Sequence, residues 1–152
     1  MKTKLAAKIV AHFSAKKWRL AAVESITGGR ISAKITAVPG ASKIFFAGGV
    51  FYDSAAKRQF LKINFQKVFS RETAEKMAKS FREITAADFA VATTGRAENG
   101  KKTFFAVATA TKVFSTEKIF FGNREKIQNA AANFALEFLE KIISTTILKS
   151  PF

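Results

Sequence analysis

A serine stands where an apolar run gives way to an amphipathic segment, in the sequence VESITGG at residues 23–29. A hydroxyl is a weak nucleophile until a neighbouring base takes its proton, and histidine is the usual base. His12 is the only histidine, and it lies between Ala11 and Phe13 of a helical pattern, where we predict a structural role. Chemistry at Ser25 therefore needs a different base.

Lysine is the alternative base, and Lys57 is the candidate. It accepts a proton near neutral pH only if its pKa falls from ~10.4 by ~3 units, or ~4 kcal/mol of differential stabilisation. Partial burial and neighbouring positive charge, including Arg58, would both lower this pKa. We expect Tyr52 to relay a proton or to orient the lysine, and the backbone N–H groups of Gly28 and Gly29 to hold a developing oxyanion.

Each of these residues also has a purely structural interpretation. Ser25 and Thr27 can cap the helix that follows them. The two glycines can serve only the close packing of that helix on the strand, and a lone lysine or tyrosine is most often a surface residue or a half-buried strand residue. Single residues therefore leave both interpretations open.

The ends of three predicted strands favour a site. The first strand ends in the polar residues of 25–29, the second ends at Tyr52, and the third ends at Thr94 and Gly95. In α/β sheets, ligands bind in the crevice at the carboxyl ends of the strands. Three polar endings together indicate a site at that edge, although the strand order is not visible from the sequence.

The hydrophobic pattern predicts a single α/β domain over residues 1–152, with a mixed β-sheet layered with α-helices. Helices are expected at 4–16, 30–38, 54–61, 70–84 and 124–147, with Ser54 and Ser70 as caps of the third and fourth. Strands are expected at 19–24, 50–52, 89–93, 103–111 and 113–121, the last two as an antiparallel hairpin. The final helix should turn Ile127, Ala131, Phe134, Phe138 and Ile142 inward.

Composition excludes several function classes. With no cysteine and one histidine in 152 residues, thiol nucleophiles, disulfides and three-histidine metal sites are impossible. The formal net charge of +15 attracts anions, but the lysines are scattered and no nucleic-acid-binding motif accompanies them, so we expect nothing beyond nonspecific nucleic-acid association. No apolar stretch approaches the length of a membrane span, and we expect no membrane partner.

Two familiar motifs are absent. Residues 95–102 nearly spell the phosphate loop G-x-x-x-x-G-K-[ST], but Lys102 replaces the hydroxyl residue, and a β-rich run follows where a helix should start. Ser25 does not lie in the G-x-S-x-G elbow of α/β-hydrolases, because position 23 is valine. The sequence therefore argues against both an NTPase and an α/β-hydrolase.

The order of several short motifs resembles the CinA C-terminal domain, or nicotinamide-nucleotide amidase, family. The matching pieces are A-x-E-S-x-T-G-G at 22–29, V-P-G-A-S at 38–42, G-x-V-x-Y-x-x-x-x-K at 48–57, S-x-E-x-A-x-x-M-A at 70–78, T-G at 94–95 and F-F-G-N-R at 120–124. Each piece is weak alone, but six in the same order, spread between Leu20 and Leu139, make a specific resemblance.

The resemblance implies a cytoplasmic enzyme that hydrolyses the carboxamide of nicotinamide mononucleotide (NMN) to nicotinic acid mononucleotide and ammonia. It assigns Ser25 as the nucleophile, Lys57 as its base and Tyr52 as a third catalytic residue. It implies substrate contacts at Thr27, Gly28, Gly29, Thr94, Gly95 and Arg124, with Arg124 suited to the phosphate. It implies no cofactor and no metal, and we expect a homo-oligomer.

This sequence departs from the family pattern at three places. The family usually continues Thr-Gly with Ile-Ala-Gly-Pro and a glycine-rich loop, whereas residues 96–100 read RAENG here. The pair after the tyrosine, commonly Ser-Asn, is Asp53-Ser54, and the residue before Arg124 is Asn123 rather than an acid. The altered loop leaves an alternative open: a CinA-like protein that binds a nucleotide or another anion with little or no turnover.

Overall fold

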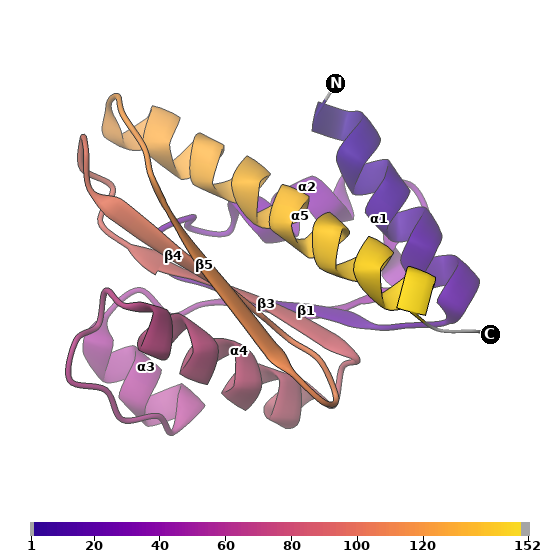
Figure 1. Cartoon of the computed structure of the whole chain (residues 1–152), viewed down its shortest axis with the longest axis horizontal. Coiled ribbons are helices and arrows are strands. Elements are labelled where there is room, and N and C mark those ends of the chain that lie inside the picture. Colours follow the sequence, from indigo (N-terminus) through magenta and orange to yellow (C-terminus); the bar gives the residue numbers. More distant parts are fainter. Residues whose placement is uncertain (1, 150–152) are drawn as a thin grey trace.

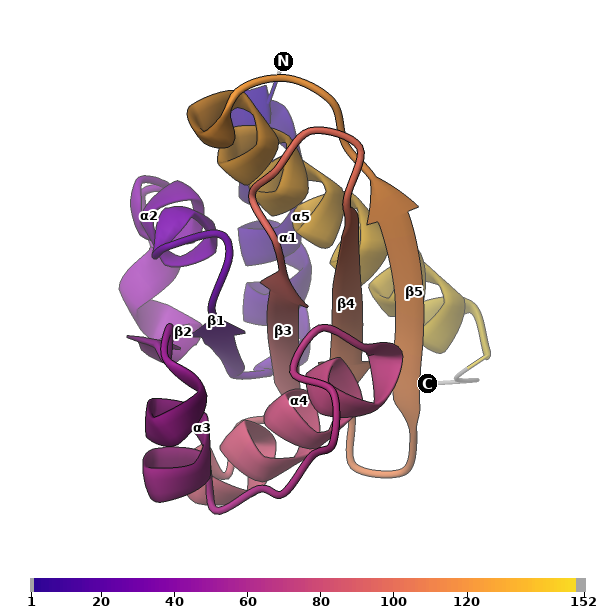
Figure 2. The ribbon, with the colours of Figure 1, turned by 90° about the vertical axis from the view of Figure 1, so that its left-hand side faces the viewer.

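A five-stranded mixed sheet is the centre of the computed structural model, which describes residues 2–149 and the side chains of residues 4–147. The strands are β1 (Leu20–Glu24), β2 (Phe45–Val50), β3 (Phe89–Gly95), β4 (Lys102–Ala108) and β5 (Val113–Ile119). Their order across the sheet is β2-β1-β3-β4-β5. β1 is parallel to both β2 and β3, while β4 is antiparallel to β3 and β5 (Figure 2). The predicted fold class and the predicted hairpin are confirmed.

Helices cover both faces of this sheet, as Figure 1 shows. The helices are α1 (Lys2–Lys16), α2 (Arg30–Thr36), α3 (Ser54–Leu61), α4 (Arg71–Thr85) and α5 (Arg124–Lys149), and a short 3₁₀ turn, η1, spans Ala41–Lys43. α1, α2 and α5 pack on one face, and α3 and α4 lie on the other (Figure 1). No helix within residues 2–149 is long and apolar enough to cross a bilayer.

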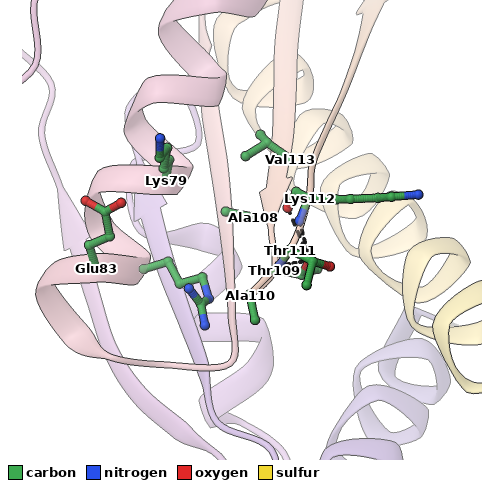
Figure 3. Close-up of a pocket in the computed structure, with 9 residues that line it drawn as sticks. Lys79, Glu83, Ala108, Thr109, Ala110, Thr111, Lys112 and Val113 are labelled. Atoms are coloured by element: carbon green, nitrogen blue, oxygen red, sulfur yellow. Dashed lines mark hydrogen bonds between the residues drawn. The ribbon is translucent and has the colours of Figure 1, made fainter. Parts of the chain in front are cut away.

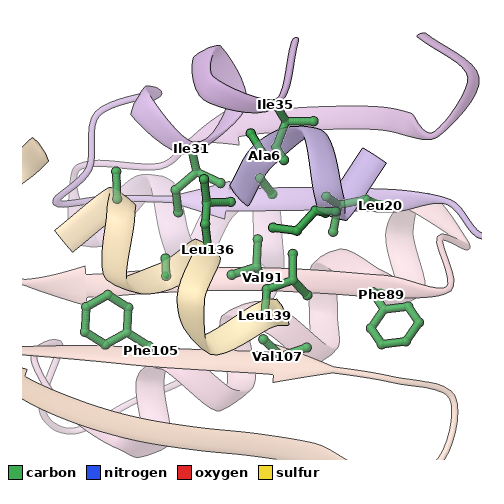
Figure 4. Close-up of a cluster of buried hydrophobic side chains, with 14 of the residues drawn as sticks. Ala6, Leu20, Ile31, Ile35, Phe89, Val91, Phe105, Val107, Leu136 and Leu139 are labelled. Carbon is green, nitrogen blue, oxygen red and sulfur yellow. The ribbon is translucent and has the colours of Figure 1, made fainter. Parts of the chain in front are cut away.

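Alternate residues of the inner strands supply the two cores. Leu20 of β1, Val91 of β3 and Phe105 of β4 face α1, α2 and α5 (Figure 4). Their neighbours on the opposite face are mostly alanines, such as Ala90 and Ala106, which pack against α4. Because successive strand residues point to opposite faces, β1 turns Glu24 and Ser25 towards different layers.

Some helix caps differ from those predicted from the sequence. Ser70 caps α4 as predicted, accepting a hydrogen bond from the Thr73 N–H at 3.1 Å. The cap of α3 is Asp53 rather than Ser54: its carboxylate accepts from the Ala55 N–H at 2.7 Å. An acid is at least as good a cap as serine, so both residues suit the position and the predicted Ser54 cap was wrong.

Several element boundaries also differ. β4 ends at Ala108 rather than at residue 111. β2 spans Phe45–Val50 rather than residues 50–52, because these are the residues that pair with β1. Tyr52 therefore lies just beyond the strand rather than at its last position. α2 ends at Thr36 instead of Val38, ahead of the turn at Gly40.

The predicted inward face of the last helix is largely correct. Ile127, Ala131 and Ile142 are buried, while Phe134 and Phe138 are partly buried against the same core. His12 on α1 lies 3.3 Å from the carboxylate of Glu140 on α5, which agrees with the structural role predicted for it.

Gly95 permits the close approach of β3 and β4, and its replacement gives the first prediction. A Cβ at position 95 would lie 2.9 Å from the Thr103 Cα and 3.0 Å from the Lys102 carbonyl oxygen. Since both are backbone atoms, we expect Gly95→Ala to lower the free energy of unfolding by about 1–3 kcal/mol. Urea denaturation measures this.

The matched control is Gly100→Asn. Gly100 has φ +74°, which asparagine tolerates better than most other residues with a side chain, and the atom nearest to an added Cβ would be 3.7 Å away. The positive φ still strains asparagine, so we expect a loss of unfolding free energy smaller than that of Gly95→Ala. Equal stability of Gly95→Ala and the wild type would contradict the close-approach argument.

Candidate active site

The carboxyl ends of β1, β2 and β3 meet at one edge of the sheet. β1 lies between the other two and is parallel to both, so the residues that follow the three strands are neighbours. Ser25 follows β1, Tyr52 follows β2, and Thr94 and Gly95 end β3. The strand order therefore produces the cluster that the polar endings suggested.

Ser25 and Lys57 form a direct hydrogen bond at this edge. The Lys57 Nζ lies 2.9 Å from the Ser25 Oγ and 3.0 Å from the Tyr52 carbonyl oxygen. Lys57 is 1% exposed and Ser25 3%. The Lys57 N–H donates to the Asp53 carbonyl at 3.1 Å, so the cap of α3 fixes the turn of helix that carries the lysine. Two groups 32 residues apart thus meet with little exposure to water.

Burial lowers the pKa of Lys57 to about 8, because the protonated amine is poorly solvated there. The charge of Asp53 opposes this effect and raises the pKa. The expected contribution from Arg58 has no counterpart in the structure: its guanidinium lies 4.2 Å from the centre of the Phe65 ring. Desolvation, not neighbouring positive charge, lowers the pKa of this lysine.

Tyr52 contacts the site differently from the expected proton relay. Its carbonyl oxygen, not its hydroxyl, meets Lys57. The side chain is 58% exposed, and its hydroxyl accepts a hydrogen bond from the Arg124 Nη1 at 3.0 Å. Tyr52 therefore orients the lysine through its backbone and joins Arg124 at the rim.

The two glycines form the turn between Ser25 and α2. Gly28 and Gly29 have φ of +57° and +93°, a region that residues with a Cβ rarely adopt. The Gly28 N–H donates to the Ser25 carbonyl at 3.1 Å, so it is already engaged in the turn. Of the two N–H groups expected to face an oxyanion, only that of Gly29 has no acceptor within residues 2–149.

Two predicted contact residues point into the protein instead. The Thr27 hydroxyl donates to Glu24 at 2.6 Å and lies 2.9 Å from the Thr93 hydroxyl. The Thr94 hydroxyl donates to the Val68 carbonyl at 3.1 Å and ties down the chain before α4. Both threonines are fully buried, so they brace the site rather than line it.

A hollow of about 200 Å³ opens beside Ser25. Its lining residues are Ser25, Tyr52, Phe69, Gly95, Arg96, Ala97, Glu98 and Arg124. The Arg96 guanidinium lies 5.2 Å from the centre of the Phe69 ring. The altered loop at residues 96–100, expected to reshape one wall of the pocket, supplies Arg96, Ala97 and Glu98. Phe69 is a wall residue that the sequence analysis did not assign.

A larger hollow lies at the other end of the sheet. It has a volume of about 320 Å³ and lies between Lys79 and Glu83 of α4 and the β4–β5 turn (Figure 3). There the Thr109 hydroxyl is occupied by the backbone of its own turn, accepting from the Thr111 and Lys112 N–H groups. This hollow is larger than the one beside Ser25, but it contains no hydroxyl that is bonded to a buried amine, as Ser25 is to Lys57.

The fold and the site define a three-layer α/β protein with a buried serine–lysine pair at the carboxyl edge of its sheet. The chain belongs to the CinA C-terminal domain family, whose sequence profile it matches over residues 2–143.

Relatives and solved structures agree with this assignment. A CinA-like protein from Flavobacterium psychrophilum is 40% identical over 142 residues, which cover 84% of this chain and 34% of that protein. A CinA-like protein from Syntrophotalea carbinolica is 36% identical over 137 residues, which cover 82% of this chain and 33% of that one. The chain thus spans about a third of the length of these curated relatives.

Two crystal structures share the fold. The competence or damage-inducible protein from Enterobacter asburiae superposes with a TM-score of 0.90 at 24% identity, covering 94% of this chain and 98% of that one. The competence/damage inducible protein CihA from Agrobacterium tumefaciens gives 0.85 at 29% identity, covering 92% and 94%. The three-layer arrangement is therefore that of the family.

The pKa of Lys57 gives the second prediction. Asp53→Asn keeps an oxygen to cap α3 but removes the charge that stabilises the protonated amine. The pKa of Lys57 should therefore fall below about 8, so that the neutral amine is available at lower pH. An NMR titration of the lysine side-chain carbons measures the midpoint.

Asp88→Asn is the matched control, since Asp88 precedes the amino end of β3 and bonds the Arg19 N–H there. This variant should leave the Lys57 midpoint unchanged. A midpoint that stays or rises in Asp53→Asn would show that Asp53 does not act on the lysine.

Proposed function

We propose that this chain hydrolyses the carboxamide of NMN, giving nicotinic acid mononucleotide and ammonia through an acyl-enzyme on Ser25. The observation that carries the proposal is the 2.9 Å hydrogen bond between the buried Ser25 hydroxyl and the buried Lys57 amine. Such a pair is what nucleophilic catalysis without histidine requires. Membership of the CinA C-terminal domain family supports the choice of substrate.

The chemistry begins with neutral Lys57. The lone pair of the amine accepts the Ser25 proton, while one of its N–H groups donates to the Tyr52 carbonyl. This carbonyl accepts a hydrogen bond from the neutral and from the protonated lysine, so it keeps the amine oriented towards Ser25 throughout. The Ser25 oxygen attacks the carboxamide carbon. The lysine then gives the proton to the amide nitrogen, the C–N bond breaks, and ammonia leaves.

The second half reverses these proton transfers. Water loses a proton to Lys57 and attacks the ester carbon, and the lysine returns that proton to the departing Ser25 oxygen. The products are the pyridine carboxylate and the original enzyme. These steps draw on Lys57 alone for acid and base and invoke no metal or cofactor. We place the reaction in the cytoplasm and in a homo-oligomer.

Substrate recognition follows from the shape and charge of the hollow. Its volume of about 200 Å³ is below that of most ligand sites, so only part of a nucleotide would be enclosed. We assign the carboxamide to the inner end beside Ser25. The phosphate would lie at the rim, where Arg124 begins α5 and can donate two parallel hydrogen bonds.

A second candidate is an anion-binding protein with little or no turnover. The observation in its favour is the charged wall of Arg96 and Glu98, which replaces the apolar, glycine-rich segment usual in the family. In this alternative the arginines bind the phosphate, but the wall does not hold the carboxamide at Ser25.

Ammonia release is the third prediction. The purified chain should convert NMN to nicotinic acid mononucleotide and ammonia in equal amounts. Ser25→Ala and Lys57→Met should each lower kcat by a factor of about 10³ or more, because each removes one half of the reacting pair. A coupled ammonia assay and mass spectrometry of an acid-quenched acyl-enzyme measure the two steps.

Ser42→Ala and Lys43→Met in the exposed part of η1 are the matched controls and should leave the rate unchanged. Binding of NMN without ammonia release above the buffer rate would favour the second candidate. Equal activity of Ser25→Ala and the wild type would rule out the serine mechanism.

The phosphate contact is the fourth prediction. Arg124→Ala should lower kcat/KM for NMN by about 10–100-fold, the loss expected for one charge-assisted contact. Nicotinamide riboside has no phosphate for Arg124 to bind. Its kcat/KM should therefore change by less than about threefold in the same variant, which is well under 1 kcal/mol. Steady-state kinetics on both substrates gives the comparison.

Lys126→Ala, an exposed cation in the same turn of α5, is the control and should affect both substrates little. If Arg124→Ala slows both substrates equally, then Arg124 acts by holding Tyr52 through their 3.0 Å hydrogen bond, and the phosphate assignment is wrong.

A further inference from the structure

Glu24 is a fully buried carboxylate immediately before the nucleophile, and the mechanism above gives it no role. One of its oxygens accepts from the Thr27 hydroxyl at 2.6 Å and the Ile31 N–H at 2.9 Å. The other accepts from the Ser32 N–H at 3.0 Å and the Ser32 hydroxyl at 2.7 Å. Four donors therefore compensate the burial of its charge and tie the end of β1 to the start of α2.

These contacts fix the direction of a hydrogen-bond chain that returns to Ser25. Ionised Glu24 can only accept, so the Thr27 hydrogen points to Glu24. Thr27 then receives the hydrogen of the Thr93 hydroxyl, which lies 2.9 Å away. The lone pairs of Thr93 are left to accept the Ser25 N–H, at 3.4 Å. The backbone of the nucleophile is thereby linked to Glu24 through two buried hydroxyls.

The backbone of Glu24 reaches the other half of the site. Its carbonyl accepts the Phe51 N–H at 2.8 Å, directly beside Tyr52. The Tyr52 carbonyl in turn receives the Lys57 amine. Glu24 thus connects the segment that contains Ser25 with the segment at Phe51 and Tyr52 that orients Lys57.

We propose that Glu24 and Thr93 are positioning residues for the Ser25 nucleophile, a role that rests on the proposed function. The carboxylate sets the direction of the chain, and Thr93 holds the Ser25 backbone so that its hydroxyl stays at Lys57. Neither side chain touches the reacting atoms. Their effect is on the rate of attack, because small displacements of a nucleophile are costly to the reaction while substrate binding is left intact.

A carboxylate is needed because no neutral isostere satisfies the same four donors. In Glu24→Gln, the NH₂ group faces the Ile31 N–H in one orientation and the Ser32 N–H in the other. Beside Thr27, it would also reverse the hydroxyl chain, so that Thr93 accepts from both Thr27 and Ser25 and its own hydrogen loses its acceptor. Thr93→Val removes the chain at one link without altering Glu24.

The test uses a reaction of Ser25 that does not depend on NMN. An alkyl fluorophosphonate reports the nucleophile: the Ser25 oxygen bonds to phosphorus, fluoride leaves and Lys57 takes the serine proton. We expect intact-mass measurements to show labelling slowed by about 10–100-fold in Thr93→Val and Glu24→Gln. Thr93→Ser, which keeps the hydroxyl, should label within about threefold of the wild type, an expectation that follows from the retained hydrogen bonds.

Two further readouts separate positioning from general damage. The pH midpoint of labelling should match the wild type in Thr93→Val, because the surroundings of Lys57 are unchanged. The dissociation constant for the product, nicotinic acid mononucleotide, measured by calorimetry, should also be unchanged. A folded Thr93→Val that labels at the wild-type rate overturns the proposal, as does slower labelling accompanied by a shifted midpoint or by weaker binding of this product.

The outcomes also distinguish this proposal from the proposed function. If the wild type reacts with the fluorophosphonate at Ser25 but releases no ammonia from NMN, the amidase proposal fails, and the labelling rates still decide the role of Thr93. If wild-type Ser25 does not react at all, it is no activated nucleophile and the positioning proposal is overturned. If Glu24→Gln does not fold, Thr93→Val decides alone.

Discussion

The burial of one amine against one hydroxyl is the constraint on which the site depends. A lysine removed from water prefers its neutral form, and in that form it can accept the Ser25 proton. The fold keeps the amine there with three separate elements: β1 leads to the serine, β2 to the Tyr52 carbonyl, and α3 carries the lysine. With a different strand order, Ser25, Tyr52 and Lys57 would no longer be neighbours.

The side chains of Glu24 and Ser25 lie in different layers of the fold. Glu24 ends β1 and Ser25 follows it directly, so the alternation of the strand directs the two side chains to opposite faces of the sheet. Ser25 meets Lys57 from the layer of α3, while Glu24 bonds the first turn of α2 in the other layer. The Glu24 carboxylate is thereby held away from the lysine, and within the described residues the carboxylate that acts on the Lys57 pKa is that of the cap residue Asp53.

Much of this could be predicted from local sequence, because local rules decide it. The hairpin, the Ser70 cap and the polar strand ends follow from periodicity and capping chemistry. The choice of Asp53 over Ser54 as the cap does not, since both types suit the position. Thr27 and Thr94 point inward because they bond Thr93 and Val68, which are distant in the sequence. Lys57 likewise contacts the Tyr52 carbonyl instead of its hydroxyl. These tertiary contacts cannot be predicted from a local sequence pattern.

The cations of the chain and the chemistry of the site act at different places. Arg96 and Arg124 are exposed at the rim of the hollow, where their attraction for an anion is screened by salt. Lys57 is buried beneath them, and its pKa is lowered by desolvation rather than by their charge. The surplus of positive charge can therefore attract an anion without contributing to the lowered pKa of Lys57. Since the two effects have separate physical origins, a change in the rim residues can alter which anion binds while the serine–lysine pair remains intact.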